Sequence, residues 1–299
     1  MRVGRIPYIN CYPVYGAIDA GAVRLEAELV DGVPTALNSM MARGVLDISV
    51  VSAIEYARAS ERYLLLPDLA ISSDGPVRSV KLFSKVPAPE LGGRRVIVSK
   101  SSMTSVALLE LLFENVWHAR PEFVPGDAEV TDVARFDEED HAARLVIGDA
   151  ALLLGSAQQR PGDSRRSTVE KAPQTDATVH RLPTTVYRFS YDLGSEWKSW
   201  TGQPFVFAVW VAQRSTPVDK SLAVHATLME SRDWGIAHIP ELAARASRAT
   251  GVNVELCRDY LSGLDYGLSY PHLAGLTEFF RRLVATGRVP NGTLAFLPA

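Results

Sequence analysis

The chain has 299 residues, of which 47% are hydrophobic and 22% are charged, and its formal net charge is −3. This composition is that of a globular protein, long enough for one large domain or two of ordinary size. Proteins that grip phosphate backbones carry a basic excess or stripe, which this sequence lacks, so we expect no nucleic-acid partner. No window approaches roughly 18 uninterrupted apolar residues, so we expect no membrane span.

The N-terminus and the cysteines favour a cytoplasmic protein. Arg2 and Arg5 are not followed by the apolar stretch of about 7–15 residues that a signal peptide needs. Cys11 and Cys257 lie far apart and show no metal or redox spacing, which is typical of a reducing compartment.

Short apolar runs alternate with amphipathic helical patterns along the chain. This order favours an α/β fold with mainly parallel strands. The polar stretch 158–176 predicts an exposed loop. The predicted strands are residues 2–6, 23–30, 46–51, 80–84, 95–98, 145–147 and 204–212, and the main predicted helices are residues 13–20, 34–43, 106–117, 218–231, 240–249, 253–262 and 271–285.

Several well-known catalytic motifs are absent from the sequence. There is no P-loop, GxGxxG, HExxH, GxSxG or EF-hand pattern, and the six histidines show no ligand spacing. We therefore expect no metal, and no nucleotide-driven or nucleophile-elbow serine-hydrolase chemistry.

Residues 99–105 (SKSSMTS) form the first candidate site, because five of the seven are Ser or Thr. The turn lies between a predicted strand and a predicted helix, where free N–H groups and the helix dipole favour a carboxylate. Ordinary N-capping by one serine is the alternative, but one cap does not require five hydroxyls. The substrate-binding candidates in this turn are Ser99, Ser102, Thr104 and Ser105.

Two further candidates follow the first strand and a turn. Asn10 lies just beyond the first strand, where ligands bind in open α/β sheets, and its amide can both donate and accept. The alternative is a turn-forming Asn before a helix. Ser79 follows the turn signal Asp74-Gly75 and is predicted to face a cleft, while Arg78 points to the opposite face. A plain loop is the alternative for this segment.

Three other residues are weighed as substrate-binding candidates. Ser52 begins the segment 52–55 (SAIE), which fits a capping box at a helix start. Asp149 lies at a strand end before a helix, a position that suits a helix N-cap and a substrate-binding residue equally. Phe205 belongs to the apolar strand 204–212, whose aromatic side chains either wall a ring-binding pocket or fill the core.

Taken together, these segments resemble one family, chorismate dehydratase, the first enzyme of the futalosine route to menaquinone. The resemblance extends from about residue 2 to about residue 280, and residues 158–176 do not match well. The segments that carry it, in the order of the family, are RVGRIPYINCYPVY, LDISVVSAIEY, SDGPVRSV, SKSSMTSVALLELL, LVIGDAALL and EWKSWTGQPFVFAVW.

The resemblance implies a two-lobed clamshell like type II periplasmic binding proteins, with the ligand cleft between the lobes. Residues 1–82 and 208–299 would form lobe 1, and residues 83–207 would form lobe 2. Two crossing strands, around residues 80–84 and 205–210, would be the hinge. The resemblance also implies the substrate chorismate and no cofactor. A transient contact with the next enzyme of the pathway is left open. The oligomeric state stays open.

The family's important asparagine falls on Asn10, its cleft serine on Ser79, and its carboxylate site on residues 99–105, where Thr104 and Ser105 match best. Removal of water from adjacent ring carbons of chorismate gives 3-[(1-carboxyvinyl)oxy]benzoate. Because aromatisation drives this step, the protein must mainly position the substrate and manage a proton. No histidine lies within the matching segments, so the resemblance implies that the substrate's own enolpyruvyl carboxylate is the base.

Two alternatives share this fold. The first is 1,4-dihydroxy-6-naphthoate synthase of the same pathway, which resembles this chain less because it has a His-Glu pair where this sequence has Gly148-Asp149. The second is a non-catalytic protein that binds a small acid, since fold alone does not determine function. Missing export and lipidation signals count against the second alternative.

Overall fold

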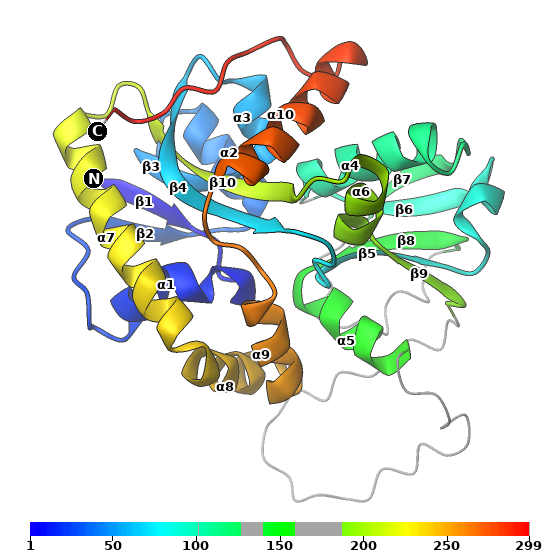
Figure 1. Ribbon diagram of the computed structural model, residues 1–299, viewed down its shortest axis with the longest axis horizontal. Coiled ribbons are helices and arrows are strands. Elements are labelled where there is room, and N and C mark those ends of the chain that lie inside the picture. The colour runs from blue at the N-terminus through cyan, green and yellow to red at the C-terminus, as the bar shows by residue number, and fades with distance from the viewer. Residues whose placement is uncertain (101, 127–139, 159–186, 299) are drawn as a thin grey trace, which may run out of the picture.

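The computed structural model describes residues 1–100, 102–126, 140–158 and 187–298. Within these ranges the chain forms two five-stranded sheets, each covered by helices (Figure 1). The predicted loop at 158–176 lies outside the described residues except for residue 158. None of the described helices combines the length and the apolar character needed to cross a membrane.

The first sheet has the strand order β2-β1-β3-β10-β4, and we call it, with its helices, lobe 1. β1 runs parallel to β2 and β3, whereas β10 is antiparallel to both β3 and β4. The strands are β1 (Arg2–Arg5), β2 (Glu28–Asp31), β3 (Ile48–Ser52), β4 (Tyr63–Ser73) and β10 (Phe205–Gln213), and the helices are α1 (Tyr12–Asp19), α2 (Pro34–Ala42), α3 (Ala53–Arg58), α7 (Val218–Ala237), α8 (Ile239–Thr250), α9 (Val254–Ser262) and α10 (Tyr270–Ala285), with a 3-10 turn η1 (Ile9–Cys11).

The second sheet has the strand order β7-β6-β8-β5-β9, and we call it, with its helices, lobe 2. β6 is parallel to β7 and β8, and β5 is antiparallel to β8 and β9. The strands are β5 (Val80–Ser84), β6 (Arg95–Ser99), β7 (Glu122–Gly126), β8 (Ala143–Ile147) and β9 (Phe189–Asp192), and the helices are α4 (Met103–Asn115), α5 (Gly148–Gln158) and α6 (Leu193–Thr201), with a 3-10 turn η2 (Ala88–Leu91).

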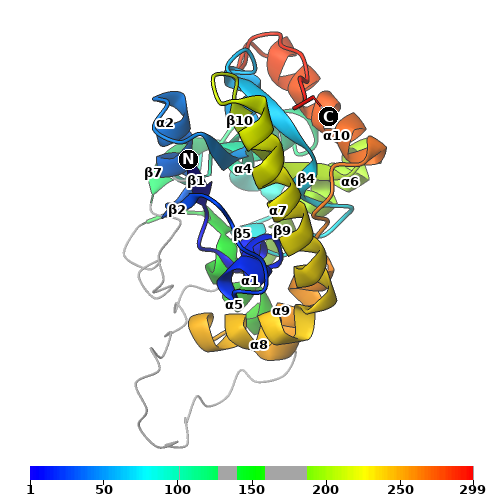
Figure 2. The same ribbon diagram turned by 90° about the vertical axis from the view of Figure 1, so that its left-hand side faces the viewer.

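The core of lobe 1 explains the apolar runs of its central strands. All five residues of β3 are buried, which is typical of a strand covered on both faces. Next to it, the indole N–H of Trp210 donates to the hydroxyl of Tyr15 at 3.0 Å, and Tyr15 donates to the Gly4 carbonyl at 3.1 Å. These bonds satisfy the polar atoms of two large buried side chains and fix α1 against the sheet. α7 packs along α1 on the same side (Figure 2).

In the described part of the chain, the backbone passes between the sheets twice, at residues 74–79 and at residues 202–204. The lobe boundaries expected from the sequence, 82/83 and 207/208, fall inside β5 and β10. The carboxylate of Asp192 accepts from the backbone N–H groups of Val77 and Arg78 at 2.9 and 2.7 Å. The same carboxylate caps α6 by accepting from Gly194 and Ser195. One side chain therefore ties the first crossing to a helix of lobe 2.

The two lobes are in contact along α4 and α6 of lobe 2. The backbone N–H of Ile54, at the start of α3, donates to the hydroxyl of Thr104 at 3.1 Å. Further along α4, Arg288 of lobe 1 pairs with Glu110 at 3.0 Å. The guanidinium of Arg282 on α10 lies 3.8 Å from the ring centre of Trp200 on α6. The described conformation is therefore one in which the lobes are apposed.

A substitution at Gly275 tests how closely α10 packs against the second crossing. A Cβ atom added there would lie 2.0 Å from the carbonyl oxygen of Pro204. We expect Gly275→Ala to lower the free energy of unfolding by about 2 kcal/mol, because the helix must move away from the crossing. Urea denaturation measures the change.

Gly155 on α5 is the matched control for this substitution. Its added Cβ would meet only the flexible end of Lys81, 3.2 Å away. Gly155→Ala is expected to be neutral or to stabilise by about 0.5–1 kcal/mol through helix propensity. Equal effects of the two substitutions would contradict the packing argument.

Candidate functional site

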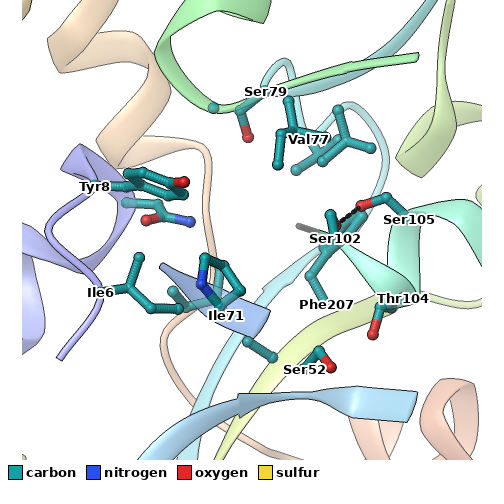
Figure 3. Close-up of a pocket in the computed structure, with 16 residues that line it drawn as sticks. Ile6, Tyr8, Ser52, Ile71, Val77, Ser79, Ser102, Thr104, Ser105 and Phe207 are labelled. Atoms are coloured by element: carbon teal, nitrogen blue, oxygen red, sulfur yellow. Dashed lines mark hydrogen bonds between the residues drawn. The ribbon is translucent and has the colours of Figure 1, made fainter. Parts of the chain in front are cut away.

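A cavity partly open to solvent lies between the lobes (Figure 3). In lobe 1 its walls are contributed by the segment that follows β1, by the start of α2 and by β3, β4 and β10. The first crossing, strand ends and helix starts of lobe 2 contribute the rest. The described residues that line it are Ile6, Tyr8, Asn10, Pro34, Ser52, Ile71, Val77, Ser79, Val80, Ser102, Thr104, Ser105, Ile147, Gly148, Phe207 and Ala208.

Six of the nine residues predicted from the sequence meet in this cavity: Asn10, Ser52, Ser79, Ser102, Thr104 and Ser105. They come from strand ends and helix starts that are remote along the chain. In open α/β sheets the carboxyl ends of parallel strands collect ligand-binding groups at one edge, and here two such edges face each other. Figure 3 shows the hydroxyls of Ser52, Ser79 and Thr104 on different walls of the same space.

The hydroxyl oxygen of Thr104 already accepts a hydrogen bond from the protein. It is buried, and its Oγ1 accepts the backbone N–H of Ile54 from the opposite lobe at 3.1 Å. A backbone N–H can only donate, so the hydroxyl proton of Thr104 stays available for another acceptor. The side chain thus presents a hydrogen-bond donor to the cavity.

Ser52 is placed at the start of α3, but the capping box predicted there does not form. Ser52 occupies the N-cap position and makes no side-chain capping bond. Its hydroxyl instead accepts from the amide Nδ2 of Asn38 at 2.9 Å. The buried amide of Asn38 replaces the capping bond as the partner of the Ser52 hydroxyl, because both of its amide atoms bond Ser52.

Ser79 is buried and follows Arg78, which adopts a positive φ of 63°. The hydroxyl of Tyr260 on α9 donates to Ser79 Oγ at 2.8 Å, and the Ser79 carbonyl accepts from the Gly148 N–H at 2.8 Å. Burial raises the pKa of Tyr260, so its hydroxyl stays protonated and remains a donor. Sequence reasoning missed Tyr260, which lies 181 residues from Ser79 in a helix with no motif.

The described hydroxyls of the turn at residues 99–105 do not act as an ordinary cap. Ser102 is the N-cap of α4 and makes no side-chain capping bond. Its hydroxyl donates to Ser105 Oγ at 2.7 Å, drawn as a dashed line in Figure 3. Ser99 lies outside the cavity lining, and its Oγ accepts from the Ser102 N–H at 3.1 Å. Ser99 therefore shapes the turn, while Ser102, Thr104 and Ser105 face the cavity.

Asn10 contributes the one amide of the described lining. It lies on η1, directly beyond β1, and its Oδ1 is buried without a hydrogen-bond partner among the described residues. An unpaired buried carbonyl oxygen is costly, and a ligand hydroxyl would satisfy it. Asn10 thus offers an acceptor in a cavity otherwise rich in hydroxyl donors.

Asp149 and Phe205 do not line the cavity. Phe205 packs edge-on against Trp197 and Phe279 in the core, with ring centres 5.2 and 4.9 Å apart, and Phe207 lines the cavity two residues further on. Asp149 follows Gly148 in the first turn of α5, and its Oδ1 is buried without a partner among the described residues. Burial raises the pKa of this carboxyl to about 6.

The electrostatic character of the cavity is neutral. None of its described lining residues is Asp, Glu, Lys, Arg or His. In the described part of the chain no group of three or more His, Cys, Asp or Glu side chains is arranged to hold a metal ion. Binding in this cavity would therefore rest on hydroxyl donors, one amide and apolar walls.

The fold defines a class of protein, the two-lobed binding-protein-like fold. Protein AF1704 from Archaeoglobus fulgidus superposes with a TM-score of 0.74 at 18% identity, covering 96% of this chain and 98% of that one. The periplasmic aliphatic sulphonate binding protein SsuA from Escherichia coli superposes with a TM-score of 0.62 at 13% identity, covering 98% and 94%. The predicted α/β clamshell is confirmed.

Sequence comparison identifies the family within this class. A family model described as menaquinone biosynthesis matches residues 1–285. The chorismate dehydratase of Thermus thermophilus is 32% identical over 281 residues, which are 93% of this chain and 95% of that protein. This chain belongs to that menaquinone biosynthesis family, as the segments in its sequence predicted.

The raised pKa of Asp149 predicts a pH-dependent effect on stability. Above about pH 6 the buried carboxylate is charged and its full burial penalty applies, and the penalty disappears as the pH falls toward about 4. We expect Asp149→Asn to stabilise the protein by about 1–3 kcal/mol near pH 8 and by little near pH 4. Urea denaturation at both pH values measures this difference.

Asp259, an exposed carboxylate on α9, provides the control for this measurement. Asp259→Asn should change stability by less than about 0.5 kcal/mol at either pH. If Asp149→Asn gives the same stability change at both pH values, its carboxyl does not carry the burial penalty.

Proposed function

We propose that this protein is a chorismate dehydratase, a lyase that converts chorismate to 3-[(1-carboxyvinyl)oxy]benzoate and water. The reaction would be the first step of a futalosine-dependent route to menaquinone. The observation that carries the proposal is the array of hydroxyls whose oxygens already accept from the protein, at Ser52, Ser79 and Thr104. Such groups remain free to donate, which suits a ligand bearing carboxylates.

The polarity of the cavity supports this substrate. Ligand sites for small organic molecules are mostly apolar with a few well-placed polar groups, and this cavity combines apolar walls with hydroxyls and one amide. Ile6, Ile71 and Phe207 offer apolar surface for a six-membered ring. Ser105 lies in the first turn of α4, where the helix dipole favours a carboxylate.

The mechanism that fits these residues is a substrate-assisted elimination. The enolpyruvyl carboxylate of chorismate takes the ring proton from the carbon that bears the ether oxygen. The C–H electrons form the new ring double bond, and the C–O bond to the hydroxyl on the neighbouring ring carbon breaks. The departing hydroxyl takes up the proton and leaves as water, so the ring becomes a benzoate and charge is conserved. Asn10 accepts a hydrogen bond from the substrate, and closed lobes exclude bulk water.

The neutral lining supports a base supplied by the substrate. The described lining residues contain no carboxylate, lysine or histidine that could take the ring proton. Asp149 is the nearest rival base, because it follows the lining residue Gly148 and its burial raises the pKa to about 6. Loss of turnover in Asp149→Asn with unchanged product binding would assign the base to Asp149 instead.

Cellular context follows from the same proposal. The two cysteines are free and buried, and we propose a cytoplasmic enzyme in a reducing compartment. A transient contact with the next enzyme of the pathway would hand over the product.

Incubation of the purified protein with chorismate tests the function directly. We expect chorismate to disappear with formation of 3-[(1-carboxyvinyl)oxy]benzoate, without added metal or nicotinamide, as followed by chromatography and mass spectrometry. Unchanged chorismate would contradict the proposal. Tight binding without conversion would instead indicate a protein that only captures a small acid.

Asn10→Ala tests the role of the unpaired amide oxygen. We expect kcat/KM for chorismate to fall by about 10²–10³, since a hydrogen bond made at the reacting part of the substrate is lost. Circular dichroism should show an unchanged fold. Asn115→Ala is the control, because that side chain bonds the Leu111 carbonyl on α4 and does not line the cavity. Full activity of Asn10→Ala would remove Asn10 from the mechanism.

A further inference from the structure

Asn38 is a buried amide in the middle of α2 whose position local preferences do not explain. It is only 3% exposed, four residues after Pro34, which lines the cavity from the same helix. Asn is a poor helix former in interior positions, and burying an amide is costly unless its atoms are hydrogen-bonded. The low helix propensity of Asn38 is unexplained by α2 itself, so its buried amide must be explained by its partners near the site.

The two bonds of Asn38 fix which way its amide faces. Its Oδ1 accepts the backbone N–H of Ser52 at 3.2 Å, and this N–H can only donate. The other amide atom is therefore the Nδ2, and it donates to Ser52 Oγ at 2.9 Å. A flipped amide would place its Nδ2 donor against the backbone N–H of Ser52, which also only donates.

This geometry sets the role of the Ser52 hydroxyl. Its oxygen accepts from Asn38, it makes no capping bond to α3, and its proton meets no acceptor among the described residues. Ser52 lines the cavity, so the proton is left for an acceptor on a bound molecule. If residue 38 offered an acceptor instead of the Nδ2 donor, the Ser52 hydroxyl would turn its proton toward residue 38 and away from the cavity.

We propose that Asn38 is a positioning residue that holds the Ser52 hydroxyl as a hydrogen-bond donor to a substrate carboxylate. The inference rests on the proposed function, because chorismate supplies the carboxylate. Asn38 does not itself line the cavity, so it acts through Ser52. Its contribution is specificity for a ligand oxygen that accepts over one that donates.

Steady-state kinetics with chorismate test the proposal. Asn38→Asp keeps an acceptor for the Ser52 N–H and replaces the Nδ2 donor by an oxygen, so the Ser52 proton turns toward residue 38. We expect KM to rise at least tenfold, with kcat changed less than threefold. Ser52→Ala should raise KM by a similar factor. A KM equal to that of the wild type in folded Asn38→Asp would overturn the positioning role.

A double-mutant cycle separates action through Ser52 from a direct effect. Asn38→Leu removes both bonds with similar volume, and it should raise KM in the wild type but by less than twofold in a Ser52→Ala background. Equal effects in both backgrounds would overturn the proposal. Isothermal titration with 3-[(1-carboxyvinyl)oxy]benzoate should show the same pattern in Kd.

Ser49→Ala is the matched control for these variants. Ser49 is buried in the same strand as Ser52, its hydroxyl donates to the Val50 carbonyl, and it does not line the cavity. Its KM should equal that of the wild type even if thermal stability falls. Absence of turnover by the wild type and by Ser49→Ala would overturn the proposed function, and the role of Asn38 with it. If the wild type and Ser49→Ala both turn over chorismate and the Asn38 variants keep the wild-type KM, only the role of Asn38 is overturned.

Discussion

The hydrogen bond from the Ile54 backbone N–H to Thr104 joins the two lobes at the place where the cavity is built. Ile54 lies two residues after Ser52, and Thr104 lies in the first turn of α4. The bond therefore brings two hydroxyl-bearing helix starts, one from each lobe, into the same space. The contacts of Arg288 and Arg282 support this apposition further along α4 and α6. The site exists as a set of converging groups only while these contacts hold.

A cavity that binds carboxylates through neutral hydroxyls has a chemical advantage for the proposed reaction. An arginine beside a carboxylate stabilises its charge and lowers its pKa, which makes it a weaker base. Hydroxyl donors hold a carboxylate in place with a smaller effect on its basicity. Where the substrate must remove its own proton, neutral donors fix its geometry and leave its carboxylate reactive. The absence of charged side chains from the described lining agrees with this requirement.

The sequence predicted much of the fold class and of the site for physical reasons that can be named. Residues 46–51 and 204–212 are short apolar runs, a local pattern typical of buried strands, and they overlap β3 and β10 of lobe 1. β4 was not predicted, because Pro67-Asp68 interrupts its apolar run, and Asp68 takes a positive φ of 50°. The predicted strand 23–30 forms only from Glu28, because β2 pairs with β1 alone at the sheet edge.

The site residues divide in the same way. Ser79 and the hydroxyls of α4 lie in unusual local sequences, so a single sequence could point to them. Asn38 and Tyr260 act through side-chain pairs 14 and 181 residues apart, and nothing local distinguishes them from ordinary helical residues. Phe205 and Phe207 both face away from neighbouring residue 206, so alternation alone could not decide which of them the cavity receives.

The bonds of Asp192 determine where this clamshell can bend. Because its carboxylate holds Val77 and Arg78 together with the start of α6, the later part of the first crossing must travel with lobe 2 as one rigid piece. A rotation of the lobes would bend the first crossing before Val77, where Gly75 has a φ of 118° and no side chain to obstruct a change, and the second crossing at Gly202, where φ is 73°. Each crossing therefore carries one glycine at which the backbone can turn, and the two lie beside neighbouring strands, after the end of β4 and before the start of β10.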